Sequence, residues 1–481
     1  MTLPEIKFGT DGWRGITGDD FTYASVRRVA KGVADYIKSR SSDPLAVVGY
    51  DCRFASEEFA RLVADVFAAN GLKSLLFNRP SPTQVVSWTV IDRKATGGVA
   101  ITASHNPYLF NGVKYKPETG SSAPTEVIKE LEQRINALGE VASPDREQVE
   151  SLVTVYDPRE AYYRQVGKMV DLDEVRNAGL KVVHETMHGS GFGYVKELIG
   201  GGKTTVTELH ADRNPFFGGH PPEPIPPNID DAIAVMKKGG FDLCILTDGD
   251  ADRVGIIDET GRFINQLQVF ALLVLHLFDV LKMTGPIVKT VNMTEMVEIL
   301  GKQFHADVYE VPVGFKWVAP KMMETNAVIG GEESGGFGIR GHIPERDGIL
   351  VGLLFADMIV KRGKPLSQIM KDLESRVGPH AYARHDIHLN RDTYDRDRKR
   401  ITEQLANHQP KEIAGVKVAR VRSDDGFKFY LEDGSWVLFR TSGTEALIRI
   451  YAEARDADAV EARLAAIEDI VGLKKEAPAH A

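Results

Sequence analysis

The sequence predicts three similar α/β domains with mixed or parallel sheets, followed by a C-terminal α+β domain. The first observation is length, because 481 residues are too many for one core at roughly 100–200 residues per domain. The second is an alternation of short β-branched runs with amphipathic helical runs that recurs three times before residue 375. The third is a change of pattern after that residue. The expected domains are 1–150, 151–265, 266–375 and 376–481.

The first expected domain shows the alternation most clearly. Short apolar strands are predicted at 46–48, 75–76 and 99–101. Between the first two strands, apolar residues recur at helical spacing and predict a helix with one buried face. Ser56 is the expected N-cap of this helix, and Gly71 is expected just after its C-terminal end.

The same order of strands and helices returns twice. In the second domain, strands are predicted in the segments LKVVHET, TTVTELH and FDLCILTDGD. In the third domain, they are predicted in PIVKTV, DVYEVP and AVIGGEES. We therefore expect three copies of one α/β plan that have diverged beyond obvious sequence repetition.

The last quarter of the chain has a different pattern. A helical stretch near 394–406 is followed by VKVARVR, GFKFYLEDGSWVLFRTS and ALIRIYAEA. The turn signals DDGF and EDGS stand between alternating runs and predict hairpins. This pattern favours an antiparallel sheet in an α+β domain.

Composition and charge exclude several classes of protein. Hydrophobic residues make up 43% and charged residues 26%, as in ordinary globular proteins and unlike disordered or fibrous ones. The 59 Lys and Arg against 68 Asp and Glu give a net charge of −9, whereas a bulk nucleic-acid binder is usually basic. No nucleic-acid partner is expected, and an anionic ligand must be held by a local cluster of cations.

Cysteine usage and hydropathy bear on location. Cys52 and Cys244 are too few for a disulfide framework and form no CxxC pair, which favours the reducing cytoplasm. The most apolar helix-length run, 267–283, is interrupted by His276 and Asp279. It predicts a buried helix and no membrane span.

The segment GGVAITASHNPYLFNGVKYK brings a serine to the carboxyl end of a predicted parallel strand. Such strand ends are where open α/β sheets place ligands, so Ser104 is a candidate functional residue. The alternative is that Ser104 and Asn106 only cap or turn the chain, as Ser and Asn in loops commonly do. Lys114 follows an expected turn at Asn111 and Gly112, so a hairpin would carry its ammonium group back beside Ser104.

The segment LCILTDGDADRVGIID packs three carboxylates together. Asp248, Asp250 and Asp252 would repel one another, and a hard divalent cation of Mg²⁺ size would relieve this repulsion. The spacing also resembles a calcium loop with Glu259 at its twelfth position, but Arg253 stands at the sixth position, where that loop requires glycine. The segment also lacks the flanking helices of such a loop. A merely solvated acidic turn is the other alternative.

The segment VIGGEESGGFGIRGHIPERDG places Glu332, Glu333 and Ser334 directly after an apolar strand. Glycine-rich loops after strands often hold phosphates, but two carboxylates oppose an anion. Carboxylate acceptors beside a hydroxyl suit the hydroxyl groups of a sugar better. The alternative is a flexible surface loop.

The segment FRTSGTEALIRIY combines two guanidinium groups, three hydroxyls and a glycine. Arginine offers paired donors and a tight turn offers backbone N–H groups, so this composition is typical of a phosphate site. A Ser- and Thr-rich turn beside a strand is also common without a ligand. The candidate residues are Arg440, Thr441, Ser442, Gly443, Thr444 and Arg449.

These four segments, in this order and with these separations, resemble the phosphohexomutase family that contains phosphoglucomutase and phosphomannomutase. The resemblance runs over nearly the whole chain and begins at FGTDGWRG. It implies four domains around a central cleft, three of one α/β type and a C-terminal domain of another. One departure is Ala446, where many relatives have proline after the SGTE segment.

The resemblance also implies roles for individual residues. Ser104 would carry the transferable phosphoryl group and would share a Mg²⁺ ion with Asp248, Asp250 and Asp252. Catalytic groups beside the phosphoserine would be Arg14, Lys114 and His105, although His105 could equally be structural, like His188 and His342. The groups that would bind the sugar phosphate are Arg253, Lys316, Glu332, Ser334, Arg440, Ser442, Gly443, Thr444 and Arg449.

The resemblance implies an isomerase that interconverts hexose 1-phosphate and hexose 6-phosphate through a phosphoserine and a hexose 1,6-bisphosphate. The GEES segment is similar to glucose-preferring members, with a phosphomannomutase or dual-specificity mutase as the alternative. Less favoured are a metal-dependent sugar-phosphate phosphatase and a non-catalytic phosphosugar-binding protein. The expected partners are small sugar phosphates, including the bisphosphate as activator, and the expected assembly is a monomer or homodimer.

Overall fold

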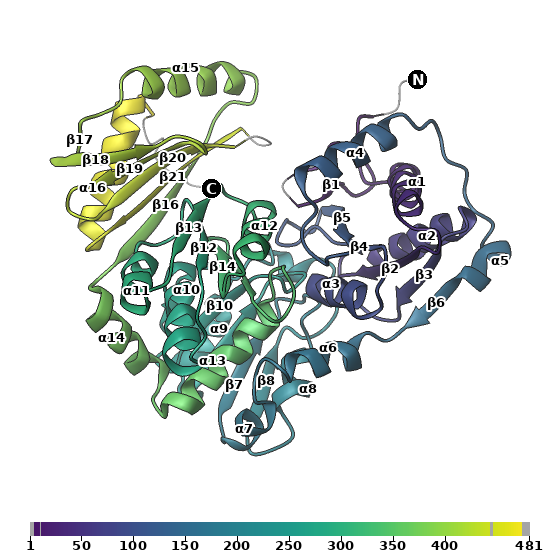
Figure 1. Ribbon diagram of the computed structural model, residues 1–481, viewed down its shortest axis with the longest axis horizontal. Coiled ribbons are helices and arrows are strands. Elements are labelled where there is room, and N and C mark those ends of the chain that lie inside the picture. The colour runs from purple at the N-terminus through teal and green to yellow at the C-terminus, as the bar shows by residue number, and fades with distance from the viewer. Residues whose placement is uncertain (1–3, 10, 443–445, 474–481) are drawn as a thin grey trace.

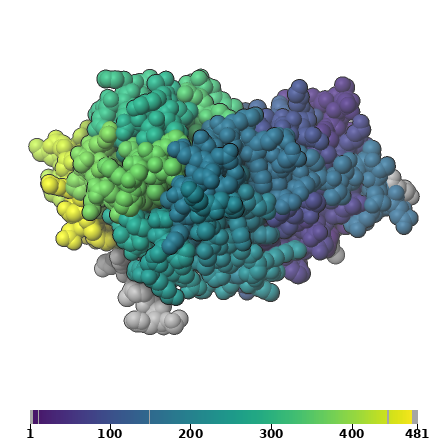
Figure 2. Space-filling view, turned by 90° about the horizontal axis from the view of Figure 1, so that it is seen from below, coloured from purple at the N-terminus to yellow at the C-terminus, as the bar shows by residue number. Residues whose placement is uncertain are grey.

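The computed structural model describes residues 4–9, 11–442 and 446–473, and it contains four sheets, each with helices packed against it (Figure 1). The N-terminal domain lies at one end of the molecule and the C-terminal domain at the other, with the second and third domains between them (Figures 1 and 2). The predicted fold class is confirmed. Among the described helices, none has both the length and the hydropathy needed to span a membrane.

The first sheet has six strands in the order β1-β5-β4-β2-β3-β6. Strand β5 runs antiparallel to β1 and β4, and the other pairs are parallel. Its strands are β1 (Trp13–Ile16), β2 (Leu45–Tyr50), β3 (Lys73–Phe77), β4 (Gly97–Ile101), β5 (Phe110–Pro117) and β6 (Val153–Tyr156). The accompanying helices are α1 (Tyr23–Arg40), α2 (Ser56–Ala69), α3 (Thr83–Asp92), α4 (Thr125–Asn136), α5 (Arg146–Val149) and the 3₁₀ turn η1 (Glu150–Leu152).

Two local expectations in this domain are wrong. Ser56 is the first residue of α2 and not its N-cap, because its hydroxyl donates to Asp51 Oδ1 at 2.8 Å and Ala55 takes the cap position. Asn111 and Gly112 form no turn and lie inside β5. A Cβ at Gly112 would come within 2.6 Å of the carbonyl oxygens of both Thr102 and Trp13, so the glycine serves close approach between strands.

The second sheet has the order β11-β10-β9-β7-β8. Strand β9 is fully buried and ends at Thr247, directly before the three aspartates, and the hairpin of β10 and β11 follows them as expected. The strands are β7 (Lys181–Glu185), β8 (Thr205–Leu209), β9 (Leu243–Thr247), β10 (Val254–Asp258) and β11 (Phe263–Ile264). The helices are α6 (Arg159–Val166), α7 (Leu172–Asn177), α8 (Tyr194–Ile199), the 3₁₀ turn η2 (Phe217–Gly219) and α9 (Asp230–Lys237).

The third sheet has the order β13-β12-β14-β15. The predicted buried helix begins at a capping box of Asn265 and Gln268 and ends in a π-helical turn. The strands are β12 (Ile287–Thr290), β13 (Val308–Val311), β14 (Ile329–Glu332) and β15 (Gly336–Ile339). The helices are α10 (Gln266–Leu275), η3 (His276–Val280), α11 (Met296–Phe304), α12 (Phe315–Thr325), α13 (Gly348–Arg362) and α14 (Leu366–Val377).

The fourth sheet is antiparallel throughout, in the order β16-β21-β20-β19-β18-β17, and the predicted hairpins are present. Its strands are β16 (Ala381–His388), β17 (Glu412–Ile413), β18 (Val416–Arg422), β19 (Phe427–Leu431), β20 (Trp436–Thr441) and β21 (Leu447–Ala454). Two helices, α15 (Tyr394–Asn407) and α16 (Ala457–Val471), pack with it.

The hydrophobic cores divide the chain unequally. One apolar cluster runs from Ile6 to Val377 and joins the first three domains. The fourth domain has a core of its own. Its contact with the third domain is mixed, because Arg422 and Lys428 donate to Glu310 at 3.0 and 2.9 Å, and a small apolar cluster packs Val291 of the third domain against Trp436, Leu438 and Tyr451. The fourth domain is therefore the one whose main core is separate from the large shared cluster.

Candidate active site

Loops from three sheets meet at one place. The loop after β4 carries Ser104, the turn between β9 and β10 carries the three aspartates, and the turn between β14 and β15 carries Ser334. Ser104 Oγ donates to Asp248 Oδ2 at 2.8 Å, so the first two loops touch although 144 residues separate these side chains. Gly249 permits this contact, because a Cβ there would lie 2.6 Å from the Ser104 carbonyl oxygen.

The backbone around Ser104 is held in an unusual conformation. Ser104 is buried and has φ of 52°, a left-handed value that few non-glycine residues adopt and that is found preferentially at functional sites. Arg53, also buried, holds the loop by donating to the carbonyl oxygens of Ser104, Asn106, Pro107 and Phe110. One guanidinium thus fixes the backbone that presents the Ser104 hydroxyl.

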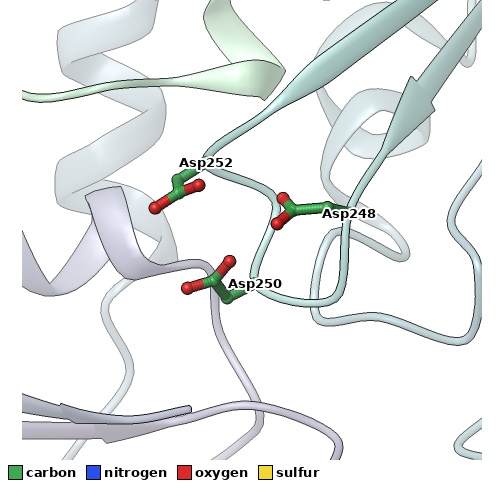
Figure 3. Close-up of side chains that lie close together, drawn as sticks. All are labelled: Asp248, Asp250 and Asp252. Atoms are coloured by element: carbon green, nitrogen blue, oxygen red, sulfur yellow. The ribbon is translucent and has the colours of Figure 1, made fainter. Parts of the chain in front are cut away.

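The three aspartates point their carboxylates toward one shared space (Figure 3). One oxygen from each of Asp248, Asp250 and Asp252 lies within 4.8 Å of the others, and all three residues are fully buried. Asp250 Oδ1 and Asp252 Oδ1 have no hydrogen-bond partner within the described parts of the chain. A buried carboxylate oxygen without a donor is costly, and an all-oxygen donor set suits a hard cation. The triad therefore fits a metal ion of the Mg²⁺ class.

The electrostatics of the triad are uneven. Burial and the neighbouring carboxylates of Asp250 and Asp252 raise the pKa of Asp248 well above its ordinary value. Burial also opposes ionisation of Asp250, but Lys114 together with Thr83 and Arg346 outweighs burial and lowers the pKa of that carboxyl. A bound divalent cation would stabilise all three carboxylates in their ionised form.

Lys114 contacts two aspartates of the triad and does not simply lie beside Ser104. Its ammonium group is buried and lies 2.8 Å from Asp250 Oδ2 and 2.9 Å from Asp252 Oδ2. A third carboxylate, Asp11 Oδ2, is 2.9 Å away. Burial opposes the charge, yet the three carboxylates raise the pKa of Lys114, so the group stays protonated. Lys114 therefore neutralises the aspartate loop.

The other groups expected around Ser104 lie close to it. Arg14, on β1, donates to Asn106 Oδ1 at 2.8 Å within the same loop. His105 Nδ1 is 3.5 Å from Ser104 Oγ, and burial together with nearby Arg253 keeps the pKa of this imidazole well below its usual value. The backbone N–H of Arg253 donates to Asp248 Oδ1 at 3.0 Å.

Two histidines have other partners. His188 Nδ1 lies 3.1 Å from Asp212 Oδ1, in the second domain. His342 Nε2 lies 2.7 Å from Asp347 Oδ2, which also accepts from the Tyr162 hydroxyl at 2.8 Å. These contacts favour a structural role for both histidines.

The glutamates of the third motif diverge. Glu332 is buried, and its Oε1 accepts from Ser334 Oγ at 2.8 Å. Glu333 instead accepts from the Tyr382 hydroxyl, on β16 of the fourth domain, at 2.7 Å. The structure therefore brings Glu332 and Ser334 together and directs Glu333 toward the fourth domain.

The candidate phosphate clamp belongs to the fourth domain. Arg440 on β20 and Arg449 on β21 are paired directly across the two strands and so share one face of the sheet. Arg440 Nε lies 2.9 Å from Asp425 Oδ1. Burial lowers the pKa of Lys316, at the start of α12, and the nearby charges of Asp425 and Arg440 also act on this pKa. The predicted residues Gly443 and Thr444 fall outside the described residues.

Arg346 joins the loops, and the sequence analysis missed it. It lies directly before the N-cap residue of α13, and its buried guanidinium is 2.9 Å from Asp252 Oδ2 and 3.1 Å from Glu332 Oε1. It also contacts Asp11 and Glu345. Charge balance is the signal that could have found it, because clustered aspartates together with Glu332 require more cationic charge than Lys114 alone supplies.

Comparison with known proteins agrees with this arrangement. Family models described as phosphoglucomutase/phosphomannomutase match in chain order. The alpha/beta/alpha domains I, II and III match residues 5–142, 160–261 and 265–377, and the C-terminal domain matches residues 398–470. The chain belongs to the phosphoglucomutase/phosphomannomutase family. It is accordingly a phosphohexomutase, an isomerase that moves a phosphoryl group within a hexose phosphate.

Individual relatives agree on the family but differ in substrate. A phosphoglucomutase/phosphomannomutase from Thermococcus kodakarensis is 29% identical, over 93% of this chain and 94% of the relative. A phosphoglucosamine mutase from Solidesulfovibrio magneticus is 28% identical, over 96% of this chain and 98% of the relative. A crystal structure from Thermus thermophilus, whose protein is assigned as a phosphomannomutase, is 34% identical with a TM-score of 0.86, covering 98% of this chain and 100% of that one.

Proposed function

We propose that this phosphohexomutase interconverts glucose 1-phosphate and glucose 6-phosphate through phospho-Ser104 and a glucose 1,6-bisphosphate intermediate. The observation that carries the proposal is the 2.8 Å contact between Ser104 Oγ and Asp248 Oδ2. This contact supports the proposal because a hydroxyl at the edge of a buried aspartate triad is suitably located to act as the nucleophile. Asp248, Asp250 and Asp252 would hold Mg²⁺ together with the phosphate on Ser104, and the ion would neutralise charge on the transferring group.

The reaction needs two transfers at the same serine. In the first, the Ser104–phosphoryl bond breaks as the free hydroxyl of the bound sugar phosphate forms a new O–P bond and loses its proton. The bisphosphate then turns over and returns its other phosphoryl group to Ser104. Arg14, Lys114 and His105 are the proposed groups for charge balance and proton transfer beside the serine, and the burial of Ser104 restricts competing transfer to water.

Binding in two orientations requires contacts that do not depend on which phosphate reacts. Arg440, Ser442 and Arg449, with Gly443 and Thr444, would hold the non-reacting phosphate in either orientation, and Lys316 would assist. Glu332 and Ser334 would accept and donate hydrogen bonds to sugar hydroxyls. The separate core of the fourth domain suits this clamp, since the clamp can release while the bisphosphate turns.

Arg449→Ala is expected to raise KM for hexose 1-phosphate about tenfold to a hundredfold, with a smaller change in kcat, because one guanidinium–phosphate contact is lost. Steady-state kinetics of phosphoryl isomerisation would measure both constants. Arg420→Ala is the matched control, since Arg420 stacks on Tyr430 at 3.7 Å in the same sheet. An unchanged KM in Arg449→Ala, or an equal rise in the control, would contradict the clamp.

Sugar preference is tested by parallel rates with glucose, mannose and glucosamine 1-phosphates. We expect the highest kcat/KM for glucose 1-phosphate, by about tenfold over mannose 1-phosphate, because the two sugars differ only in the orientation of the C2 hydroxyl. A higher value for mannose would make the enzyme a phosphomannomutase. Release of free phosphate faster than isomer formation would indicate a phosphatase. The bisphosphate as activator and a cytoplasmic location, favoured by two buried cysteines without a disulfide, belong to the same proposal.

A further inference from the structure

The N-terminus of α3, in the first domain, reaches the aspartate loop of the second. The Thr83 backbone N–H donates to the Asp250 carbonyl oxygen at 3.0 Å, and the Thr83 hydroxyl donates to Asp250 Oδ2 at 2.7 Å. Gln84 Nε2 donates to the Ala251 carbonyl oxygen at 2.8 Å. Thr83 and Gln84 are buried, so water cannot substitute for these donors. Neither residue belongs to any of the motifs above.

The two carboxylate oxygens of Asp250 differ in their hydrogen bonding. Oδ2 accepts from Thr83 Oγ1 at 2.7 Å and from Lys114 Nζ at 2.8 Å. Oδ1 is buried and, among the residues described, receives no donor. Two donors on one oxygen fix the rotation of the carboxylate and direct the other oxygen into the triad. Lys114 alone would orient the Asp250 carboxylate poorly, because its ammonium group also contacts Asp11 and Asp252.

We propose that Thr83 is a positioning residue for Asp250: its hydroxyl selects Oδ2 as the hydrogen-bonded oxygen and leaves Oδ1 for the cation. The inference rests on the metal site of the proposed function. It adds that the domain carrying Ser104 also orients a ligand carried by the next domain. The N-terminus of α3 would then hold the phosphoserine loop and the metal ligands in a fixed relative position.

Gln84 extends the contact between α3 and the aspartate loop, and its partners explain why Thr83 is the residue to substitute. Its amide also lies 3.2 Å from Asp347 Oδ1, whose carboxylate accepts from Tyr162. Gln84 thus anchors the backbone of the loop at Ala251. Only the Thr83 hydroxyl touches a carboxylate of the triad from α3, so its removal changes the ligand directly.

The test is titration of the full-length enzyme with Mn²⁺, without substrate, by isothermal calorimetry. Mn²⁺ prefers the same hard oxygen ligands as Mg²⁺. Thr83→Val keeps the shape and removes the donor, and we expect Mn²⁺ affinity to fall about tenfold to a hundredfold, as for other residues that orient metal ligands. Thr83→Ser retains the hydroxyl, so its affinity should stay within about threefold of wild type.

Thr89→Val is the matched control on the same helix. The buried Thr89 hydroxyl donates to the Val85 carbonyl oxygen at 2.7 Å and has no contact with the aspartate loop, so Mn²⁺ affinity should be unchanged. If Thr83→Val does not fold, Thr83→Ala removes the same donor and should show the same loss. Wild-type affinity in the Val or Ala variant, or an equal loss in Thr83→Ser or Thr89→Val, would overturn the inference alone. A wild-type enzyme that binds no Mn²⁺ would overturn the metal site and the inference together.

Discussion

Ser104→Ala should lower the exchange between hexose 1-phosphate and hexose 6-phosphate by about 10⁴-fold or more, because the group that carries the phosphoryl is gone. His105, Lys114 and Arg14 would remain, but none of them replaces a hydroxyl that touches Asp248 at 2.8 Å. The measurement is isomer exchange under saturating sugar phosphate. Incubation with radiolabelled bisphosphate should label the wild-type protein and leave the variant unlabelled.

The same substitution should leave the fold intact. It removes one buried hydrogen bond, so the free energy of unfolding should change by no more than about 1–2 kcal/mol. Ser87→Ala is the matched control, because the buried Ser87 hydroxyl, on α3, has no hydrogen-bond partner in the described part of the chain. That variant should retain exchange. Near-normal exchange in Ser104→Ala would show that another group is the nucleophile.

Asp250→Asn should abolish metal binding and lower exchange by more than about a hundredfold. The reason is the arrangement of donors around this side chain. Thr83 and Lys114 both donate to Oδ2, so the single oxygen of asparagine must stay there and its NH₂ group must occupy the place of Oδ1. An NH₂ group cannot bind a cation. Turning the amide over would instead point NH₂ at two donors.

Two measurements test this result. Chelator should remove the activity of the wild-type enzyme, and added Mg²⁺ should restore it, whereas Asp250→Asn should respond to neither. Asp258→Asn is the control in the same domain, since Asp258 is buried but accepts from Thr260 and Arg262 in the β10–β11 hairpin. It should keep its Mg²⁺ response. An Asp250→Asn enzyme that runs at full rate in chelator would exclude the triad as the metal site.

Local pattern predicted most of the fold. The strands at 46–48, 75–76 and 99–101 and the helix near 394–406 are present, because their periodicity is carried by neighbouring residues. Ser56 and Gly112 show where this reasoning fails. Asp51 competes for the Ser56 hydroxyl, and Gly112 is required by strands packed on both sides of it. For Ser56 the deciding contact is an acceptor five residues earlier that competes with the cap, and for Gly112 it is packing against chain that is distant in sequence.

From sequence alone, the four motifs and their order were sufficient to name the family and most of the residues to examine, and the alternation of strands and helices predicted the fold class. Which cation serves which carboxylate was decided only by tertiary structure. Thr83 reaches Asp250 across 167 residues, Lys114 reaches it across 136, and Arg346 reaches Asp11 across 335. Each pair faces the other because separate sheets pack on a common core, and side-chain direction at such a junction depends on domain packing, which no local periodicity records.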